Sequence, residues 1–350
     1  MSPVFCRIRM NSIGYFAGAN GTKGFVCYFG EVIKNLSSVY ILKGGCGCGK
    51  SALMKKIAAE AEKRGLGVER IYCASDPQSL DGVVVPALSV GVVDGTSPHD
   101  ISPRLPGAAD SIINLGECWD SEKLRARVLD IKALTDKKEG AIIRAYSLFA
   151  AVGSLQKERD RLLETAVLWE KMSAAAARLL RKTASVNEEF SSNIRLREAF
   201  CSTGTVTAPS FGEKNTVALK DSYGIAYLFL EQLLAAAYGK GLGVTVSPSA
   251  LEPHKIGALL VEDTGELYCV DNSAAKPINL ERFLDKQRLS DIKAKLRFLG
   301  KAIKSLKEEA RQSMAESRKA HLELEAIYTP AMNFREVDII TEKLIKEIFA

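Results

Sequence analysis

The sequence predicts an α/β fold with two units in tandem, each followed by a long helical arm. Between residues 37 and 95, short apolar runs that end at glycine, proline or aspartate surround one stretch with helical spacing. Two later blocks, residues 121–189 and 286–327, are rich in charge and patterned as amphipathic helices. Short sequence segments of the first half also recur, in similar form and in the same order, in the second half, which indicates an internal repeat.

The composition is that of a soluble globular protein. Of 350 residues, 47% are hydrophobic and 26% are charged, which suits two domains of ordinary size. We find no apolar stretch long enough to span a membrane and no secretory signal. The eight cysteines are scattered without C-x2-C spacing, so we expect reduced thiols and a cytoplasmic location. The net charge of +6 permits an anionic partner without requiring one.

The first unit is expected to contain a strand, a helix and three further strands. "SSVYILKGG" at 37–45 predicts a buried strand, and "SALMKKIAAEAEKRG" at 51–65 predicts the helix, which Gly65 ends. The further strands are expected in "GVERIYCA" (67–74), "DGVVVP" (81–86) and "LSVGVVDG" (88–95).

The repeat defines the predicted domains. "INLGECWD" (113–120) matches "INLERFLD" (278–285), and "EKRGLGV" (62–68) matches "AYGKGLGV" (237–244). "DP" at 76–77 aligns with "EP" at 252–253, and "YFAGANGT" (15–22) resembles "AFCSTGT" (199–205). Chance similarity is the alternative, but several matches in one order favour duplication. We therefore expect a core at 1–120, an arm at 121–195, a second unit at 196–285 and a basic arm at 286–350.

One motif in the first unit carries chemistry. Gly44-x-x-x-x-Gly49-Lys50-Ser51 fits the P-loop pattern between a predicted strand and a predicted helix. Bare glycines let backbone N–H groups and the helix N-terminus approach a triphosphate. Lys50 is placed to reach the β- and γ-phosphates, and the Ser51 hydroxyl to bind Mg²⁺. The predicted cofactors are thus ATP or GTP with Mg²⁺, and the predicted nucleotide-binding residues are Gly44, Gly45, Cys46, Gly47, Cys48, Gly49, Lys50 and Ser51.

The second unit lacks this motif. Aligned on the shared "LK", "LKGGCGCGKSALMKK" in the first unit faces "LKDSYGIAYLFLEQ" in the second. Most glycines are gone, and only Ile225 to Phe229 stand near the positions of Lys50 and Ser51. We therefore expect the second unit to be a degenerate copy that does not bind triphosphate in this way.

A carboxylate at a neighbouring strand end is expected to complete the Mg²⁺ site. Asp94 follows an apolar run and is the predicted catalytic and metal-binding partner of Lys50, although a turn-forming aspartate would look the same. Asp76 is a rival and Asp81 a weaker one. A hydrolytic base is not evident, with Glu117 as the one candidate for positioning water.

Other residues near the motif have a functional and a plainer interpretation. His99 and Arg104 could touch phosphate, but exposed loop side chains are the more common state of such residues. Cys46 and Cys48 could be reactive thiols near a helix N-terminus, although tolerated small residues are the simpler interpretation. Residues 286–319 carry eleven Lys/Arg and four acids, which fits a solvated helix face better than a nucleic-acid interface.

These motifs resemble a poorly characterised group of bacterial P-loop ATPase-like proteins with two tandem NTPase-like halves. The resemblance covers nearly the whole chain and is strongest from Tyr15 to Asp120. It implies ATP binding and an ATPase or kinase activity, with no defined physiological substrate. Cys46 and Cys48 depart from the family's "GGPGTGKS"-like loop, and the second P-loop that members can carry is absent here.

The leading functional hypothesis is an ATPase whose nucleotide state changes the geometry of its halves or arms. A phosphotransferase is one alternative, for which "TSPHDISPRLPGAAD" (96–110) would have to serve as a lid. A non-hydrolysing ATP-gated scaffold is another, in which the arms bind a protein partner. The absence of an obvious catalytic base favours the scaffold modestly.

Overall fold

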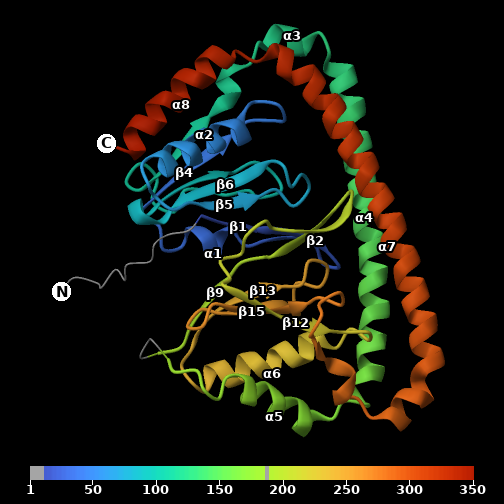
Figure 1. Ribbon diagram of the computed structural model, residues 1–350. Helices are drawn as coiled ribbons and strands as arrows, with labels where there is room; N and C mark the ends of the chain where they lie inside the picture. Colours follow the sequence, from blue (N-terminus) through green and yellow to red (C-terminus); the bar gives the residue numbers. More distant parts are fainter. Residues whose placement is uncertain (1–11, 186–188) are drawn as a thin grey trace.

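Two six-stranded sheets lie one above the other beside a pair of long helices (Figure 1). The computed structural model describes residues 12–185 and 189–350. Both sheets mix parallel and antiparallel strands, and each is followed in the chain by long helices. This confirms the α/β class and the alternation of sheets with helical stretches.

The first sheet contains all the strands predicted around the glycine-rich motif. Its order is β1 (Ile13–Phe16), β5 (Glu69–Tyr72), β6 (Leu80–Val85), β7 (Val90–Asp94), β4 (Ser38–Lys43) and β8 (Asp110–Asn114). β4 lies parallel between β7 and β8, whereas β6 is antiparallel to both of its neighbours. The carboxyl ends of β4 and β7 therefore meet at one edge of the sheet.

The second sheet repeats this topology. Its order is β9 (Ser191–Ile194), β13 (Gly243–Pro248), β14 (Ile256–Val261), β15 (Glu266–Val270), β12 (Asn215–Lys220) and β16 (Ile278–Asn279). Here β12 lies parallel between β15 and β16, and β14 is antiparallel to both neighbours. Equal order and equal directions support the duplication that the recurring phrases indicate.

Each unit also carries a β-hairpin, and here the predicted alignment has the wrong register. The hairpins are β2 (Gly18–Gly21) with β3 (Gly24–Cys27), and β10 (Glu198–Cys201) with β11 (Gly204–Thr207). Gly24 and Gly204 both follow the turn and both have positive φ, +81° and +101°. The equivalent residues are therefore Gly24 and Gly204, whereas the sequence alignment placed Gly21 opposite Gly204. The two segments were aligned by residue identity, without reference to the turn that fixes the register of each hairpin.

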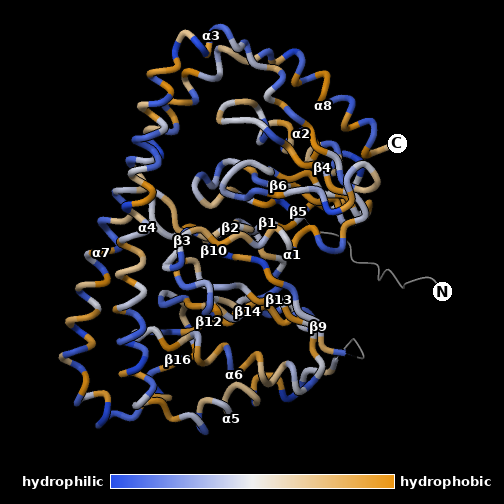
Figure 2. The backbone as a smooth tube through the Cα atoms, turned by 180° about the vertical axis from the view of Figure 1, so that it is seen from behind, coloured by the Kyte–Doolittle hydropathy of each residue, from blue (hydrophilic) through white to orange (hydrophobic). Residues whose placement is uncertain are grey.

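The helices complete both units. They are α1 (Phe29–Ile33), α2 (Lys50–Lys63), α3 (Ser121–Arg125), α4 (Val128–Glu164), α5 (Trp169–Leu179), α6 (Ala226–Tyr238), α7 (Lys286–Tyr328) and α8 (Phe334–Ile348). Short 3₁₀ turns are η1 (Pro86–Leu88), η2 (Leu115–Cys118), η3 (Leu280–Phe283) and η4 (Thr329–Ala331). α4 and α7, about 55 Å and 65 Å long at 1.5 Å per residue, lie side by side and run in opposite directions (Figures 1 and 2).

The matching "INL" phrases start the helical stretches in the same way. Asp120 and Asp285 end these phrases, and their carboxylates accept hydrogen bonds from the N–H groups of Lys123 and Arg288. These are N-caps of α3 and α7, which satisfy backbone donors that a helix start leaves free. The repeat therefore marks the two points at which the chain leaves a sheet and enters the helices.

The last helix of each arm covers the other unit. α5 follows the arm of the first unit but packs on α6 of the second, and α8 follows α7 but packs on α2 of the first. Two equivalent bridges fix this exchange: Trp119 pairs with Met332, and Val167 pairs with Leu284. The predicted arm at 121–195 also includes β9, which belongs to the second sheet. This strand is short and polar, so its composition resembles that of a helix surface or loop.

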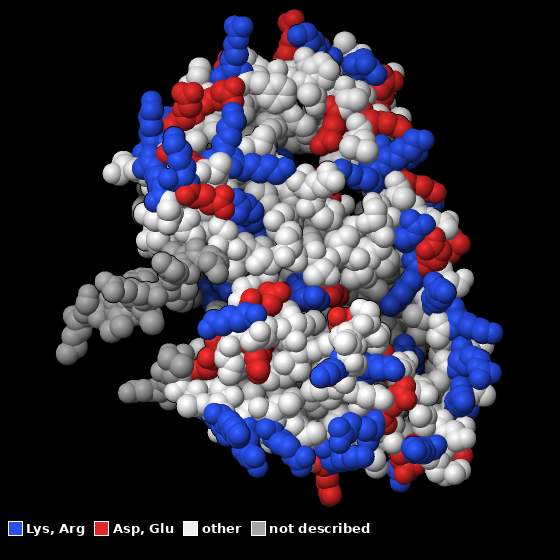
Figure 3. All heavy atoms as spheres, viewed as in Figure 1, with Lys and Arg blue, Asp and Glu red and all other residues white. Residues whose placement is uncertain are grey.

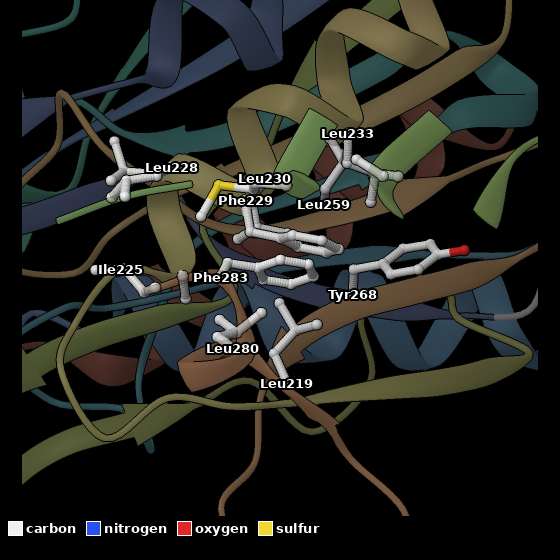
Figure 4. Close-up of a cluster of buried hydrophobic side chains, with 14 of the residues drawn as sticks. Leu219, Ile225, Leu228, Phe229, Leu230, Leu233, Leu259, Tyr268, Leu280 and Phe283 are labelled. Carbon is white, nitrogen blue, oxygen red and sulfur yellow. The ribbon is translucent and has the colours of Figure 1, made fainter. Parts of the chain in front are cut away.

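Three layers of core follow from this arrangement. The outer face of the second sheet packs on α6 and α5 around Phe229, Phe283 and Tyr268 (Figure 4). The outer face of the first sheet packs on α2 and α8. The inner faces of both sheets share a cluster that includes Ile41 and Leu260. Within the described part of the chain, every helix is either too short or too polar to cross a lipid bilayer.

The basic stretch lies on α7, where most of its cations face solvent (Figure 3). The exposed ones are Lys286, Arg288, Lys293, Lys295, Arg297, Lys301, Lys304 and Lys319. Lys307, Arg311 and Arg318 are partly covered. The stretch is therefore mainly a solvated helix face with a few inward-turned cations.

Candidate functional site

The glycine-rich motif lies where β4 ends and α2 begins, as the sequence predicts. β4 is a central strand whose Val39, Ile41 and Leu42 are fully buried. α2 begins at Lys50 and turns Leu53 and Ile57 into the core. The loop between them is thus held at the edge of the first sheet, with the N-terminus of a 14-residue helix directed toward it.

Glycine is required at specific points of this loop. Gly47 and Gly49 have φ values of +69° and +91°, in the left-handed region that side chains disfavour. A Cβ atom on Gly44 would lie 2.7 Å from the Cys48 sulfur, and one on Gly47 would lie 2.8 Å from the Thr329 hydroxyl. Among the described residues, no oxygen accepts from the N–H groups of Gly45, Gly47 or Gly49. These donors therefore have no protein acceptor among the described residues.

Lys50 folds back into the loop. Its ammonium donates to the carbonyl oxygens of Gly44 at 2.6 Å and Gly45 at 2.9 Å. It also lies 3.6 Å from a carboxylate oxygen of Asp94, and both side chains are nearly buried, at 12% and 13% exposed. The structure therefore brings together the two residues that the sequence singles out as catalytic.

Asp94 reaches this position because β7 lies beside β4. The register places Asp94 opposite Leu42, one strand away from the loop. One carboxylate oxygen accepts from the N–H of Thr96 at 2.8 Å and from its hydroxyl at 2.5 Å. The other oxygen faces Lys50. The short turn after β7 thus orients the carboxylate toward the lysine.

Ser51 is tied to the neighbouring strand β6. Its hydroxyl oxygen accepts a hydrogen bond from the N–H of Leu80 at 3.0 Å. A serine hydroxyl keeps a second lone pair and a donor, so it retains the capacity to bind another group. The contact holds the first turn of α2 against the start of β6.

The loop cysteines are not activated thiols. Cys48 is buried and Cys46 is partly covered. Burial raises the pKa of both thiols, and for Cys48 the nearby Lys50 ammonium offsets this only in part. A raised pKa keeps the thiol protonated and weakly nucleophilic. These properties are those of small packed residues.

The rival aspartates have partners of their own. Asp76 accepts from the Ser79 hydroxyl at 2.8 Å and forms an ion pair with Arg318 of α7 at 2.8 Å. Asp81 forms an ion pair with His99 at 3.1 Å. Neither has a described contact with Lys50, so Asp94 is the carboxylate that the fold places beside the lysine.

His99 is buried, which differs from the exposed loop histidine that we expected. Its side chain is 7% exposed and lies against the rings of Phe25 and Phe29. Burial opposes protonation, but the hydrogen bond to Asp81, the contact with Cys27 and the charges of Asp81 and Asp94 together outweigh it and raise the pKa of His99 to about 10. The imidazolium anchors the segment after β7 to the start of β6.

Arg104 and Glu117 do not reach the loop through any described contact. Arg104 is not the free surface side chain that we expected: it pairs with Asp110 at 2.8 Å and donates to the carbonyl oxygens of Ile33 and Leu36. Its guanidinium lowers the pKa of Asp110 to about 2. Glu117 is exposed and accepts from the Asn114 amide at 3.2 Å. The segment at 96–110 is therefore fastened at His99 and again at Arg104.

The second unit fills the equivalent loop with its own carboxylate. Asp221 follows Lys220 as Gly44 follows Lys43. Its oxygens accept from the N–H groups of Tyr223 at 3.1 Å, Gly224 at 2.7 Å and Ala226 at 2.7 Å. An internal anion thus occupies the donors at the start of α6. This arrangement agrees with the expectation that the second loop does not take phosphate.

The residues that cover the first loop were not predicted from the sequence. The aromatic ring of Trp119 lies about 3 Å from the Cβ position of Gly45, and Tyr328 lies against Trp119 with ring centroids 5.5 Å apart. Val337 and Phe334 of α8 border Gly49, and Thr329 borders Gly47. The one available signal was the weak likeness of "TAVLW" (165–169) to "TPAMNF" (329–334), which mark the equivalent ends of α4 and α7.

No cluster of three or more His, Cys, Asp or Glu is arranged to hold a metal within residues 12–185 and 189–350. Comparison with models of known protein families, with curated proteins and with solved structures gave no significant match.

Proposed function

We propose that the first unit is a P-loop nucleoside triphosphatase that binds ATP or GTP with Mg²⁺ at Gly44–Ser51. The observation that carries this proposal is the position of the Lys50 ammonium, inside a glycine loop and beside Asp94. A strand, a glycine-rich loop and a helix N-terminus surround it, which is the setting that a triphosphate requires. On binding, Lys50 would exchange its carbonyl partners for phosphate oxygens, which are stronger acceptors because they are charged.

The residues present fit a magnesium ion. Mg²⁺ uses one or two protein oxygens, together with phosphate oxygens and water, rather than a complete protein cage. Ser51 and Asp94 offer a hydroxyl and a carboxylate on adjoining elements of the site. When bound, the ion would neutralise charge that develops on the phosphates.

The contacts of the loop suggest how nucleotide state changes the shape of the chain. Gly47 touches the end of α7, and Gly49 touches the start of α8. α7 continues along α4 to the second unit. A ligand that repositions the loop would therefore bias the packing of the arms, which we infer to be the output that a protein partner recognises.

A non-hydrolysing switch is the second candidate. The carboxylates near the loop are each paired: Asp94 with Lys50, Asp76 with Arg318 and Asp81 with His99. Glu117 is bound to Asn114 at the surface. A phosphotransferase is less well supported, because the segment proposed as its lid is fastened at both His99 and Arg104.

The test is binding and turnover by Lys50→Ala. We expect the native chain to bind ATP or GTP with Mg²⁺, and the variant to lose at least tenfold in affinity because a charge-assisted phosphate contact disappears. Calorimetry measures the binding, and phosphate release measures turnover. Binding with lysine-dependent release supports the ATPase, and binding without release supports the switch.

The matched control is Lys63→Ala. Lys63 is at the other end of α2 and its side chain is 80% exposed, so its loss should leave binding unchanged. Equal affinity of the native chain and Lys50→Ala, or no binding by the native chain, would overturn the proposal.

A further inference from the structure

We propose that Arg318 of α7 senses the terminal phosphate of the nucleotide bound by the first unit. This inference rests on the proposed function of the glycine loop. It adds that a residue from the arm of the second unit enters that site and distinguishes a triphosphate from a diphosphate.

The last turns of α7 pass over the edge of the first sheet where the loop lies. Arg318, His321 and Glu325 are spaced by three and four residues, so they share one helix face. At one end of this face Arg318 pairs with Asp76 at 2.8 Å. At the other end, the backbone of Glu325 lies 3.5 Å from the Cβ position of Gly47. The segment 318–325 therefore spans the distance between Asp76 and the glycine loop.

Hydrogen bonds connect the resting partner of Arg318 to the loop residues. The Asp76 carboxylate accepts from the Ser79 hydroxyl, and the Asp76 backbone carbonyl accepts from the Ser79 N–H. The next residue, Leu80, donates its N–H to the Ser51 hydroxyl. Arg318 is thus linked to Ser51, the residue proposed to bind Mg²⁺, through Asp76, Ser79 and Leu80. Its side chain is 28% exposed, whereas most cations of the same stretch face solvent.

Without nucleotide, the charged side chains at this edge of the sheet form two ion pairs. Lys50 is paired with Asp94, and Arg318 is paired with Asp76. A magnesium-bound triphosphate brings an anion for both cations and a cation for Asp94. Asp76 is 22% exposed and keeps the Ser79 hydroxyl as a donor, so Arg318 can turn to a phosphate oxygen while its former partner stays solvated.

The second unit shows the contrast. There α4 contributes Arg159, which donates to the carbonyl oxygen of Tyr223, and Asp160, which pairs with Lys255. Lys255 also pairs with Glu252 at 2.8 Å and is 9% exposed. With Asp221 already bound to the loop N–H groups, these buried contacts close the second site. In the first unit Asp76, which aligns with Glu252, pairs instead with the partly exposed Arg318.

The test compares the affinities for a non-hydrolysable triphosphate analogue and the diphosphate, both with Mg²⁺, by calorimetry. We expect Arg318→Ala to lower triphosphate affinity about tenfold and to leave diphosphate affinity within about twofold. Asp76→Asn frees the arginine, so it should keep or raise triphosphate affinity. Arg311→Ala, on the same helix and paired with Glu308, is the control and should change neither affinity.

A purely structural ion pair gives a different result. Arg318→Ala and Asp76→Asn would then behave alike, and the ratio of the two affinities would stay constant, which overturns the inference. If Arg318→Ala does not fold, Asp76→Asn alone decides, because a loss of triphosphate affinity in that variant contradicts phosphate sensing. Lys50→Ala separates the two proposals. If nucleotide binding depends on Lys50 but Arg318→Ala leaves the ratio of triphosphate to diphosphate affinity unchanged, only the sensor is refuted. If the native chain binds no nucleotide, the site itself is refuted.

Discussion

Asp221 and Gly44 occupy equivalent positions, each directly after a matching lysine. The two loops differ in whether a carboxylate accepts hydrogen bonds from the backbone N–H groups. In the second unit the carboxylate accepts three backbone N–H groups at the start of α6. In the first unit Gly44 has no side chain to play this part. A single side chain therefore supplies the internal hydrogen bonds of the second loop, which the first loop lacks.

Replacing Asp221 tests this at the residue scale. Asp221→Ala should lower the free energy of unfolding by about 1–2 kcal/mol, because the start of α6 loses its acceptor. Urea denaturation measures the change. The control is Asp291→Ala on α7, where the carboxylate is exposed and bonded only to Gln287 in the same helix; its effect should stay within about 0.5 kcal/mol. Equal effects of the two variants would contradict the capping role.

At the scale of elements, α8 is the helix that closes the first unit. It buries Val337, Leu344 and Ile348 against α2 and the first sheet, and its start borders the glycine loop. Tyr40 of β4 also donates to Glu347 at 2.8 Å. The stability of the glycine-rich loop therefore depends on a helix that follows the second unit in the chain.

Two apolar residues of α8 provide a matched test. Leu344 is 2% exposed, so Leu344→Ala should lower the free energy of unfolding by about 2–4 kcal/mol through lost burial and the cavity that remains. Ile339 is 66% exposed on the same helix, and Ile339→Ala should change it by less than about 0.5 kcal/mol. Chemical denaturation distinguishes the two. Similar small effects would show that α8 is not firmly packed.

The sequence predicts local elements better than their partners. Strand β4, helix α2 and strand β7 follow from apolar runs and from Gly65, so Lys50 and Asp94 could be placed at one sheet edge before the structure was known. The exchange of α5 and α8 could not be predicted, because helical periodicity shows that a face is apolar but not which unit covers it. His99 was misjudged for a related reason: its burial depends on Asp81 and two phenylalanines distant in sequence.

On the scale of the whole molecule, the exchanged helices make the two units interdependent. α4 and α7 contact each other along their length, and the inner faces of the two sheets share one cluster. Each unit also relies on a terminal helix that belongs to the arm of the other. Such a chain should unfold as one cooperative body, although it is long enough for two domains.

Calorimetry tests this cooperativity. Met172→Ala removes a fully buried side chain of α5 in the second unit, and Leu344→Ala removes one of α8 in the first. Both variants should lower the midpoint of the same single thermal transition. Two transitions, each lowered by only one variant, would show that the units unfold independently.

The exchanged helices also bear on how such a chain can originate. In a polypeptide with a single repeat, the helix on the outer face of the sheet would lack the covering helix that α5 or α8 supplies here. A second copy could supply that helix, as in a domain-swapped homodimer. Gene fusion converts that symmetric dimer into one chain. Within one chain the two copies can diverge separately, so that one carries the Lys50 loop and the other fills its own with Asp221.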